Sequence, residues 1–493
     1  MKKCFDNELY SKLQIENIQK LIDMFDQKLY MEFGGKIFDD MHASRVLPGF
    51  NPNAKIKILE TMKDKTEIIF IISAKDIEKN KKRADNDLPY SLDILRVIDK
   101  IRKMGILVSN ILITLYEDQP SALSFKKMLE ARGEKVFLHR KTKGYPTDVE
   151  TIVSEEGYGA NPYIPTTRPL VVVAAPGPGS GKLATCLSQL YHEYKKGVKA
   201  GYAKFETFPI WNLPLKHPVQ LAYEAATIDL RDKNMIDPFH LYAYGEQAIN
   251  YNRDIEAFPL LQHLLEKITG NKDLYKSPTD MGVNMAGNAI IDDEGCREAA
   301  KQEIIRRYLN IKCDNFKGLC DNESVVIAKQ LMDEVNAAIC DRYVTKQALE
   351  TESEQGRPCV AIQVSKHKVI CGFENHIFTA SAACVLRTLK HFCDVDEMLP
   401  VISENQAQDI LEIKHNALHE NTKLDVDDLL AILATNKISM PLIEMLLDKV
   451  SNLVGLDAHS TFILPNKDRI TLKKLGLNIT STAKYVDNNL FME

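Results

Sequence analysis

The stretch with the clearest chemical potential is a glycine-rich loop between an apolar run and a helix-like segment, LVVVAAPGPGSGKLATCLSQL (residues 170–190). Glycine adopts backbone conformations that other residues avoid, so such a loop can curl its amide N–H groups around an anion. The helix that follows adds unpaired N–H groups and partial positive charge at its start. We expect a phosphate or carboxylate group to bind here, through Gly177, Gly179, Ser180, Gly181, Lys182 and Thr185.

The loop departs from the two common phosphate-binding patterns. In the P-loop pattern GxxxxGK[ST], Pro176 replaces the first glycine and Leu183 replaces the Ser or Thr that holds magnesium. In the pattern GxGxxG, Lys182 replaces the last glycine. Two interpretations stay open: a phosphate-binding loop, with nucleotide hydrolysis as one version of it, or a tight strand-to-helix turn whose glycines serve packing.

Charged side chains elsewhere could complete such a site. Lys182 and the loop amides would bind phosphate, and Arg45 or Lys204 would add positive charge. Glu206 and Asp229 each follow a segment that we interpret as a strand, so both are predicted magnesium ligands; the alternative is that they are surface or capping carboxylates. The predicted catalytic residues are therefore Lys182, Arg45 and Asp229.

Arg45 belongs to the polar segment DDMHASR (residues 39–45), which follows the run KIF (residues 36–38). In open parallel sheets, ligands bind beyond the carboxyl ends of the strands. If KIF is such a strand, Arg45 is well placed for a bidentate contact with an anion. Ordinary loop polarity is the alternative.

Three further polar groups have both a ligand-binding and a structural interpretation. His415 and His419 are spaced by one helical turn, but Asn416 occupies the glutamate position of HExxH and a third ligand is not evident, so we do not expect zinc. The remaining residues could contact a ligand, but Ser, Thr, Asp and Asn are also the preferred helix caps. They are Ser277, Thr279, Asp280, Asn284, Thr379 and Ser381.

The composition indicates an ordinary globular protein. The 493 residues are 45% hydrophobic and 27% charged, with a formal net charge of −5 and both signs mixed along the chain. We therefore expect a small-molecule partner that contains phosphate, no nucleic acid, and possible homo-oligomers. No apolar run approaches the ~20 residues of a membrane span, and the start has no apolar signal region, so we expect a cytoplasmic protein without membrane contact. Its ten cysteines form no CxxC pair and are expected to be reduced.

Short apolar runs alternate with amphipathic segments in the first half of the chain, which predicts an α/β fold with a mainly parallel sheet and flanking helices. We divide the chain into an N-terminal α/β domain (residues 1–240), a helical subdomain (241–334) and a C-terminal α/β subdomain (335–493). The predicted strands of the first domain are EIIFIISA (67–74), VSNILITLY (108–116), KVFLHR (135–140), PLVVVAA (169–175) and KIFDD (36–40).

Four long stretches together resemble a known family: EFGGKIFDDMHASRVLPGF, AAPGPGSGKLATCLSQLYHEY, GYAKFETFPIWNLPLKHPVQLAYEAAT and YKSPTDMGVNMAGNAI. They are similar to the uncharacterised bacterial family catalogued as domain of unknown function eighteen forty-six, over nearly the whole chain. The resemblance implies a cytosolic bacterial protein whose C-terminal part has a cytidine-deaminase-like layered topology. The deaminase zinc motif, HxE with PCxxC, is absent from the sequence, so the resemblance does not imply deamination.

Two functions are the main hypotheses, beside a metal-dependent hydrolase activity through His415 and His419 that would require stoichiometric zinc. The first is an enzyme that binds ATP or another nucleotide with magnesium at residues 177–182 and catalyses phosphoryl transfer or ligation. The second is a non-catalytic ligand-binding or regulatory protein that uses the same anion site. Magnesium-dependent turnover would separate them.

Overall fold

The chain forms two compact units. The computed structural model describes residues 3–83, 88–420, 423–437 and 440–486. The first unit comprises Met1–Ala300 and the second comprises Lys301–Glu493. The division falls within α12 (Asp293–Phe316), so the segment 241–334, for which the sequence suggests a helical subdomain, is shared between the two units.

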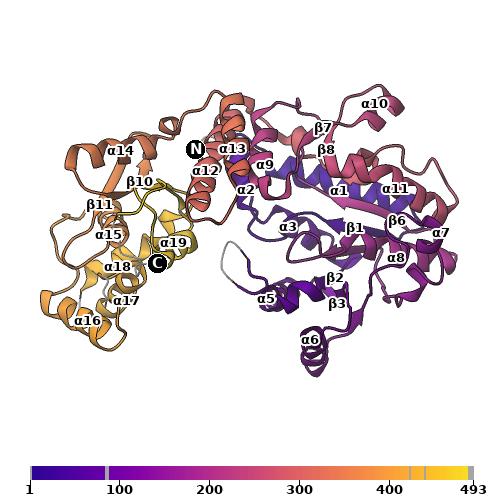
Figure 1. Ribbon diagram of the computed structural model, residues 1–493, viewed down its shortest axis with the longest axis horizontal. Helices are drawn as coiled ribbons and strands as arrows, with labels where there is room; N and C mark the ends of the chain where they lie inside the picture. Colours follow the sequence, from indigo (N-terminus) through magenta and orange to yellow (C-terminus); the bar gives the residue numbers. More distant parts are fainter. Residues whose placement is uncertain (1–2, 84–87, 421–422, 438–439, 487–493) are drawn as a thin grey trace. The chain divides into compact units, whose positions relative to one another are not determined.

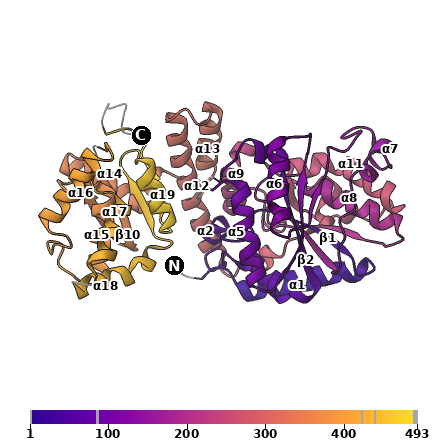
Figure 2. The ribbon, with the colours of Figure 1, turned by 90° about the horizontal axis from the view of Figure 1, so that it is seen from below.

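The first unit is built on a seven-stranded sheet of order β4-β3-β2-β5-β1-β6-β9, in which every neighbouring pair is parallel. An all-parallel sheet needs cover on both faces, and Figures 1 and 2 show helices on both. A separate antiparallel pair joins β7 (Asn234–Ile236) to β8 (Ile249–Tyr251). The strands of the large sheet are β1 (Leu29–Phe33), β2 (Thr66–Ser73), β3 (Leu107–Thr114), β4 (Val136–Leu138), β5 (Leu170–Ala174), β6 (Gly201–Phe205) and β9 (Gly282–Val283).

Several helices of this unit begin and end at residues that are typical helix caps. Asp6 and Asp40, for example, cap α1 and α2 with their carboxylates, and Gly270 ends α11 in a left-handed conformation. No helix among the described residues is long and apolar enough to cross a membrane. The helices are α1 (Asn7–Met24), α2 (Met41–Val46), α3 (Ala54–Thr61), α4 (Ala74–Glu78), α5 (Tyr90–Lys103), α6 (Pro120–Ala131), α7 (Val149–Ile152), α8 (Lys182–Lys195), α9 (Pro218–Ala226), α10 (Pro238–Tyr244) and α11 (Asn252–Thr269).

The structure confirms the predicted α/β class and four of the five predicted strands, which are β2, β3, β4 and β5. The fifth prediction is wrong, because β1 is Leu29–Phe33 and the run 36–38 lies in the loop after it. A Cβ on Gly34 would lie 2.9 Å from the carbonyl oxygen of Phe205, and Gly35 has φ +69°. The two glycines therefore end a strand instead of preceding one.

β5 lies at the centre of the sheet, between β2 and β1. From β2 the chain proceeds to β3, on one side, and from β5 it proceeds through α8 to β6, on the other side. Right-handed crossovers in opposite directions place their helices on opposite faces of the sheet. The carboxyl ends of β2 and β5 thus form a topological switch point, the usual place for a ligand in an open α/β sheet.

The second unit contains a four-stranded mixed sheet of order β11-β10-β12-β13, in which only the β12–β13 pair is parallel. The segment CVAIQVSKHKVICGF (359–373) is typical of a strand pair, and it forms β10 (Cys359–Ser365) and β11 (Lys368–Phe373). β12 is Asp457–Ser460 and β13 is Asn478–Ser481. Apolar side chains of β10, β12 and β13 form a core with α15 and α17.

The helices of the second unit after α12 differ from the sequence prediction at one point. The sequence suggests one helix over residues 324–344, but α13 ends at Glu334 and α14 begins at Tyr343. Asn336 interrupts the helix with φ +49°, a conformation that asparagine tolerates better than most residues. The helices are α13 (Asn322–Glu334), α14 (Tyr343–Gln355), α15 (Ala380–Phe392), α16 (Glu404–Asn416), α17 (Val426–Asn436), α18 (Pro441–Asp448) and α19 (Asn466–Lys474).

Candidate functional site

The glycine-rich loop connects the carboxyl end of β5 to the first residue of α8, Lys182. Gly179 has φ +69° and Gly181, which caps the helix, has φ +85°. Both values lie in the left-handed region that favours glycine. The backbone itself therefore requires glycine at these two positions.

Amide N–H groups gather at this loop without acceptors. Thr185 donates the first hydrogen bond of α8, to the carbonyl of Gly181 (3.0 Å). In the described part of the chain, the amides of residues 179–184 donate to no acceptor, and no side chain caps the helix. Gly179 and Ala184 are exposed, so a ligand in solution can reach this end of the loop. Such a set of N–H groups at a helix start is suited to an anion.

Lys182 adds a full positive charge at the start of α8. Its Nζ lies 3.7 Å from Oε1 of Glu32 in β1, and the two side chains are only 13% and 14% exposed. Among the described residues Nζ has no acceptor within hydrogen-bond distance. A mostly buried ammonium without a hydrogen bond is costly, and an anionic ligand at the loop would supply the missing acceptor.

The other loop residues have structural partners. The Ser180 hydroxyl donates to the carbonyl of Gly177 (2.7 Å), and the Thr185 hydroxyl donates to the carbonyl of Gly181 (2.9 Å). A Cβ on Gly177 would lie 2.5 Å from the hydroxyl oxygen of Tyr90. Packing thus explains Gly177, and the two hydroxyls serve the turn in this conformation, as the structural interpretation of the loop predicts.

A second group of charged residues lies at the carboxyl end of β6, beside β1. Nζ of Lys204 lies 2.6 Å from Oε1 of Glu206 and 2.5 Å from Oδ2 of Asp254, in the first turn of α11. Lys204 is the parallel-sheet partner of Glu32, whose carboxylate also accepts a hydrogen bond from the Tyr202 hydroxyl (3.2 Å). Glu32 therefore connects the Lys182 end of the loop with the Lys204 cluster.

This cluster changes the acidity of its members. Burial raises the pKa of Glu206 to about 7; the charge of Lys204 opposes that shift, and the carboxylates of Asp254 and Glu32 reinforce it. The same carboxylates raise the pKa of Lys204 against the effect of burial, so the lysine keeps its charge. Glu206 thus has a pKa near neutral at the same edge of the sheet as the glycine-rich loop, with β1 between the two, and such a pKa is typical of groups that transfer protons.

The other predicted site residues lie elsewhere in the first unit. Glu206 follows a strand as predicted, but Asp229 does not: it lies in a 3-10 helix (Ile228–Leu230) that follows α9. The apolar residues before Asp229 belong to the end of a helix, and a short apolar run does not distinguish a helix from a strand. Asp229 is exposed and makes no hydrogen bond or ion pair with any residue that the structure describes. Arg45 lies half-buried in the last turn of α2.

Five of the six remaining polar candidates serve the fold, and the sixth, Ser381, is buried in α15. Ser277 and Asp280 form a capping box, Thr279 donates to Asp237 (2.7 Å), and Asn284 donates to a backbone carbonyl (2.6 Å). Thr379 caps α15.

The two histidines do not share a helix. His415 is in the last turn of α16, whereas His419 lies beyond its end, with φ +58°. No group of three or more potential metal ligands occurs among the described residues.

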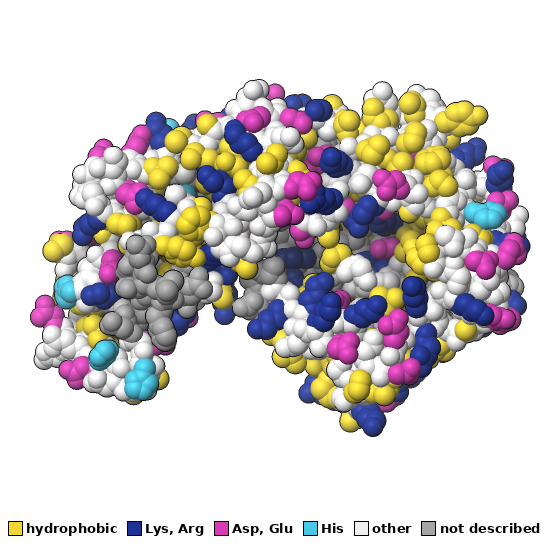
Figure 3. Space-filling model, viewed as in Figure 1, with side chains coloured by type: hydrophobic (Ala, Val, Ile, Leu, Met, Phe, Trp, Pro, Cys, Tyr) yellow, Lys and Arg dark blue, Asp and Glu magenta, His cyan; other side chains and the backbone are white. Residues whose placement is uncertain are grey.

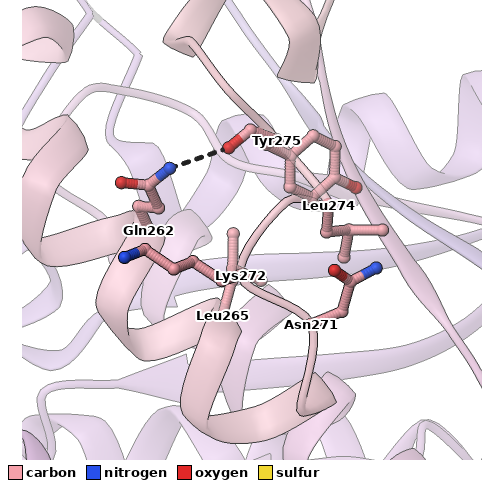
Figure 4. Close-up of a pocket in the computed structure, with 6 residues that line it drawn as sticks. All are labelled: Gln262, Leu265, Asn271, Lys272, Leu274 and Tyr275. Atoms are coloured by element: carbon pink, nitrogen blue, oxygen red, sulfur yellow. Dashed lines mark hydrogen bonds between the residues drawn. The ribbon is translucent and has the colours of Figure 1, made fainter.

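One small pocket is distinct from this site. It is shallow and lies between α11 and the segment that follows it, where Gln262 donates to the carbonyl of Tyr275 (3.1 Å; Figure 4). Tyr275 also bonds both backbone groups of Tyr202, near the start of β6 (2.6 and 3.1 Å). The pocket therefore adjoins the amino end of β6, away from the loop at the carboxyl edge.

Sequence reasoning missed Glu32 and Asp254. Glu32 could have been recognised from the sequence, since it is the one charged residue in the otherwise apolar strand LYMEF. An acidic residue that is partly buried in a central strand needs a partner, which indicates a site. Asp254 had no such signal, because an acidic residue in the first turn of a helix is ordinary.

Fold and site together define an α/β protein with a glycine-rich loop at the switch point of a parallel sheet. The family model of Domain of unknown function DUF1846, N-terminal, matches residues 3–336, and that of the C-terminal domain of the same name matches residues 340–491. The chain belongs to this family, which confirms the resemblance inferred from the sequence.

Curated relatives cover the full chain. A UPF0371 protein of Clostridium botulinum (strain Alaska E43 / Type E3) is 47% identical over 500 residues. UPF0371 proteins of Clostridium tetani and Fusobacterium nucleatum are each 48% identical, over 500 and 504 residues. Each alignment spans 100% of this chain and 99% of the relative. The names of these relatives assign no activity, so the function has to be argued from the site.

Proposed function

We propose that the protein binds the phosphate group of a nucleotide or of another phosphorylated small molecule at residues 177–182, and that it is an enzyme of phosphoryl transfer or ligation. The observation that carries the proposal is the run of amides at residues 179–184 without acceptors, next to the mostly buried ammonium of Lys182. Backbone N–H groups and one lysine are the usual partners of a phosphate at a helix start.

The neighbouring cluster supports chemistry rather than binding alone. In phosphoryl transfer, positioning and charge neutralisation supply most of the catalysis. Lys182 would neutralise phosphate charge, and Glu206, whose pKa is about 7, would accept a proton from an attacking hydroxyl or water. Lys204 would be a positioning residue that holds Glu206.

Magnesium would accompany the phosphates of a nucleotide such as ATP. Of the two predicted ligands only Glu206 lies at the carboxyl edge of the sheet, and holding the ion would be an alternative to its role as proton acceptor, because one carboxylate cannot do both. Asp229 would have no role in catalysis. Arg45 follows β1 and remains a candidate for a second phosphate contact. The cytoplasmic location, homo-oligomers and the cytidine-deaminase-like topology of the second unit stay predictions from the sequence.

Calorimetry with ATP, GTP, ADP and inorganic phosphate, with and without magnesium, tests the proposal. Lys182→Met should weaken binding of the preferred ligand by about tenfold or more, because it removes a charge-assisted contact. Lys195→Met is the matched control, since Lys195 lies in the last turn of the same helix and is exposed. Equal affinities in wild type and Lys182→Met would contradict the proposal.

Turnover separates enzyme from binding protein. Magnesium-dependent release of diphosphate or phosphate that is lost in Glu206→Gln, while binding persists, would support catalysis. Tight binding without turnover, with a range of acceptor hydroxyl and amine compounds present, would favour a regulatory role.

A further inference from the structure

A second concentration of positive charge lies in the second unit, between α12 and α19. Both helices adjoin β13: Cys313 of α12 donates to the carbonyl of Ser481 (3.1 Å), and α19 packs against the strand that it precedes. The two helices therefore bring side chains from distant parts of the sequence to one place.

The α12 side contributes two guanidinium groups that share one carboxylate. Arg306 donates two hydrogen bonds of 2.6 Å to Glu303, and Arg307 donates one of 2.8 Å to the same group. The three residues lie on one helix face because they are three and four positions apart. Glu303 and Arg306 are 1% and 12% exposed at the side chain, so this ion pair is mostly buried.

The α19 side contributes Arg469 and Lys473, one helical turn apart. Nε of Arg469 is buried and has no hydrogen-bond partner among the described residues, while Nη2 donates to Asn466 (3.3 Å). Lys473 likewise makes no hydrogen bond or ion pair with any residue that the structure describes. Neither cation therefore forms an ion pair with a carboxylate among the described residues, although the charge of Asp314 acts on both.

The electrostatics of Lys473 show that like charges face it. Burial lowers the pKa of Lys473 to about 8, and the positive charges of Arg469, Arg306 and Arg307 lower it further; the carboxylate of Asp314 on α12 opposes them. Glu303, Asp314 and Asp457 offset part of this positive charge, but Arg469, Arg306 and Arg307 still repel Lys473. A folded protein gains nothing from such repulsion, so an anion that relieves it is the natural occupant.

We propose that Arg469 and Lys473 of α19, with Arg306 of α12, bind the phosphate group of a small molecule. Arg469 and Lys473 lie one helical turn apart, and Nε of Arg469 is buried without an acceptor, so the pair suits a compact dianion with several acceptor oxygens. An extended polyanion would need a basic surface, whereas Figure 3 shows acidic and basic side chains interspersed on the face that it draws. This site lies in the second unit and is independent of the glycine-rich loop in the first.

Calorimetric titration of the full chain with inorganic phosphate tests the proposal. Lys473→Met and Arg469→Gln should each weaken phosphate binding by about tenfold or more. Lys474→Met is the matched control, because this lysine is adjacent on the same helix but exposed. Lys182→Met in the same titration distinguishes the two sites: it should leave this binding event intact even if it abolishes one at the loop.

Two results would overturn the proposal. One is absence of phosphate binding by the wild type at millimolar concentration; the other is unchanged affinity in both Lys473→Met and Arg469→Gln, with circular dichroism confirming the native fold. Binding should also weaken between pH 7 and pH 9.5, as Lys473 loses its proton. Sulfate in place of phosphate reports whether charge alone suffices for recognition.

Discussion

The ammonium of Lys204 lies 2.6 Å from the carboxylate of Glu206, two positions further along the chain at the carboxyl end of β6. Lys204 belongs to β6 and Glu206 directly follows it, so their short separation along the chain holds the two groups together. Asp254 also contacts Lys204, at 2.5 Å, and therefore competes with Glu206 for its charge. This competition, together with burial, brings the pKa of Glu206 to about 7.

Glu206→Gln should change the pH dependence of stability. The carboxyl has a pKa of about 7 in the folded state, against an unperturbed value of 4.5, so the folded state binds more protons between these values. The free energy of unfolding of the wild type should therefore fall as pH rises through that interval. In the variant this contribution disappears, and its stability relative to wild type should increase by about 1–3 kcal/mol between pH 5 and pH 8.

Urea denaturation at several pH values measures that difference. Glu60→Gln is the control, because Glu60 is an exposed glutamate at the surface of α3. A difference between Glu206→Gln and wild type that is constant with pH would show that Glu206 is ionised throughout the range.

Local sequence signals account for most of the first sheet. Unbroken β-branched runs predicted β2 and β5, and the glycine-rich loop after β5 predicted an anion site at its carboxyl end. The contacts that define the site could not be predicted, because they join distant segments: Glu32 meets Lys182, and Asp254 meets Lys204. The strand predicted before Asp229 is an error of the opposite kind, in which a local signal misled. A short apolar run at a helix end has the same composition as a strand.

Gly181→Ala should destabilise the protein and weaken the anion site together. Alanine at φ +85° costs about 1–2 kcal/mol, because its Cβ crowds the backbone in the left-handed region. The nearest atom to a Cβ here is Cβ of Thr114, at an ordinary 3.5 Å, so the cost is conformational. Relaxation of the strain should move the amides of residues 179–184 and reduce ligand affinity.

Gly197→Ala separates these two effects. Gly197 follows the other end of α8 at φ +80°, with no atom within 4 Å of a Cβ. It should lose similar stability in thermal or chemical denaturation but keep the wild-type affinity for phosphate ligands. Loss of affinity in both variants would show that global destabilisation, not loop geometry, governs binding.

Asp457→Asn should destabilise the second unit strongly. Arg342 is 2% exposed; Nη2 lies 3.0 Å from Oδ1 of Asp457 and donates to the carbonyl of Asn478 (2.7 Å). Without the carboxylate, a buried guanidinium loses its counter-charge, at a cost of about 2–4 kcal/mol. Glu397→Gln, which weakens the exposed pair with Arg387, is the control and should cost less than about 1 kcal/mol. Equal losses in chemical denaturation would contradict this ranking.

Lys473→Met should stabilise the ligand-free protein at neutral pH. The pKa of Lys473 is lowered from 10.5 to about 8, so the folded state binds fewer protons than the unfolded state between these values. Wild-type stability should therefore rise from pH 8 to pH 10.5, and below pH 8 the charged lysine costs about 1–3 kcal/mol. The gain in Lys473→Met should be largest at pH 7 and shrink above pH 9, which separates it from any packing benefit of methionine. A variant less stable than wild type at pH 7 would mean that the ammonium already has a stabilising partner, and the anion site between α12 and α19 would lose its basis.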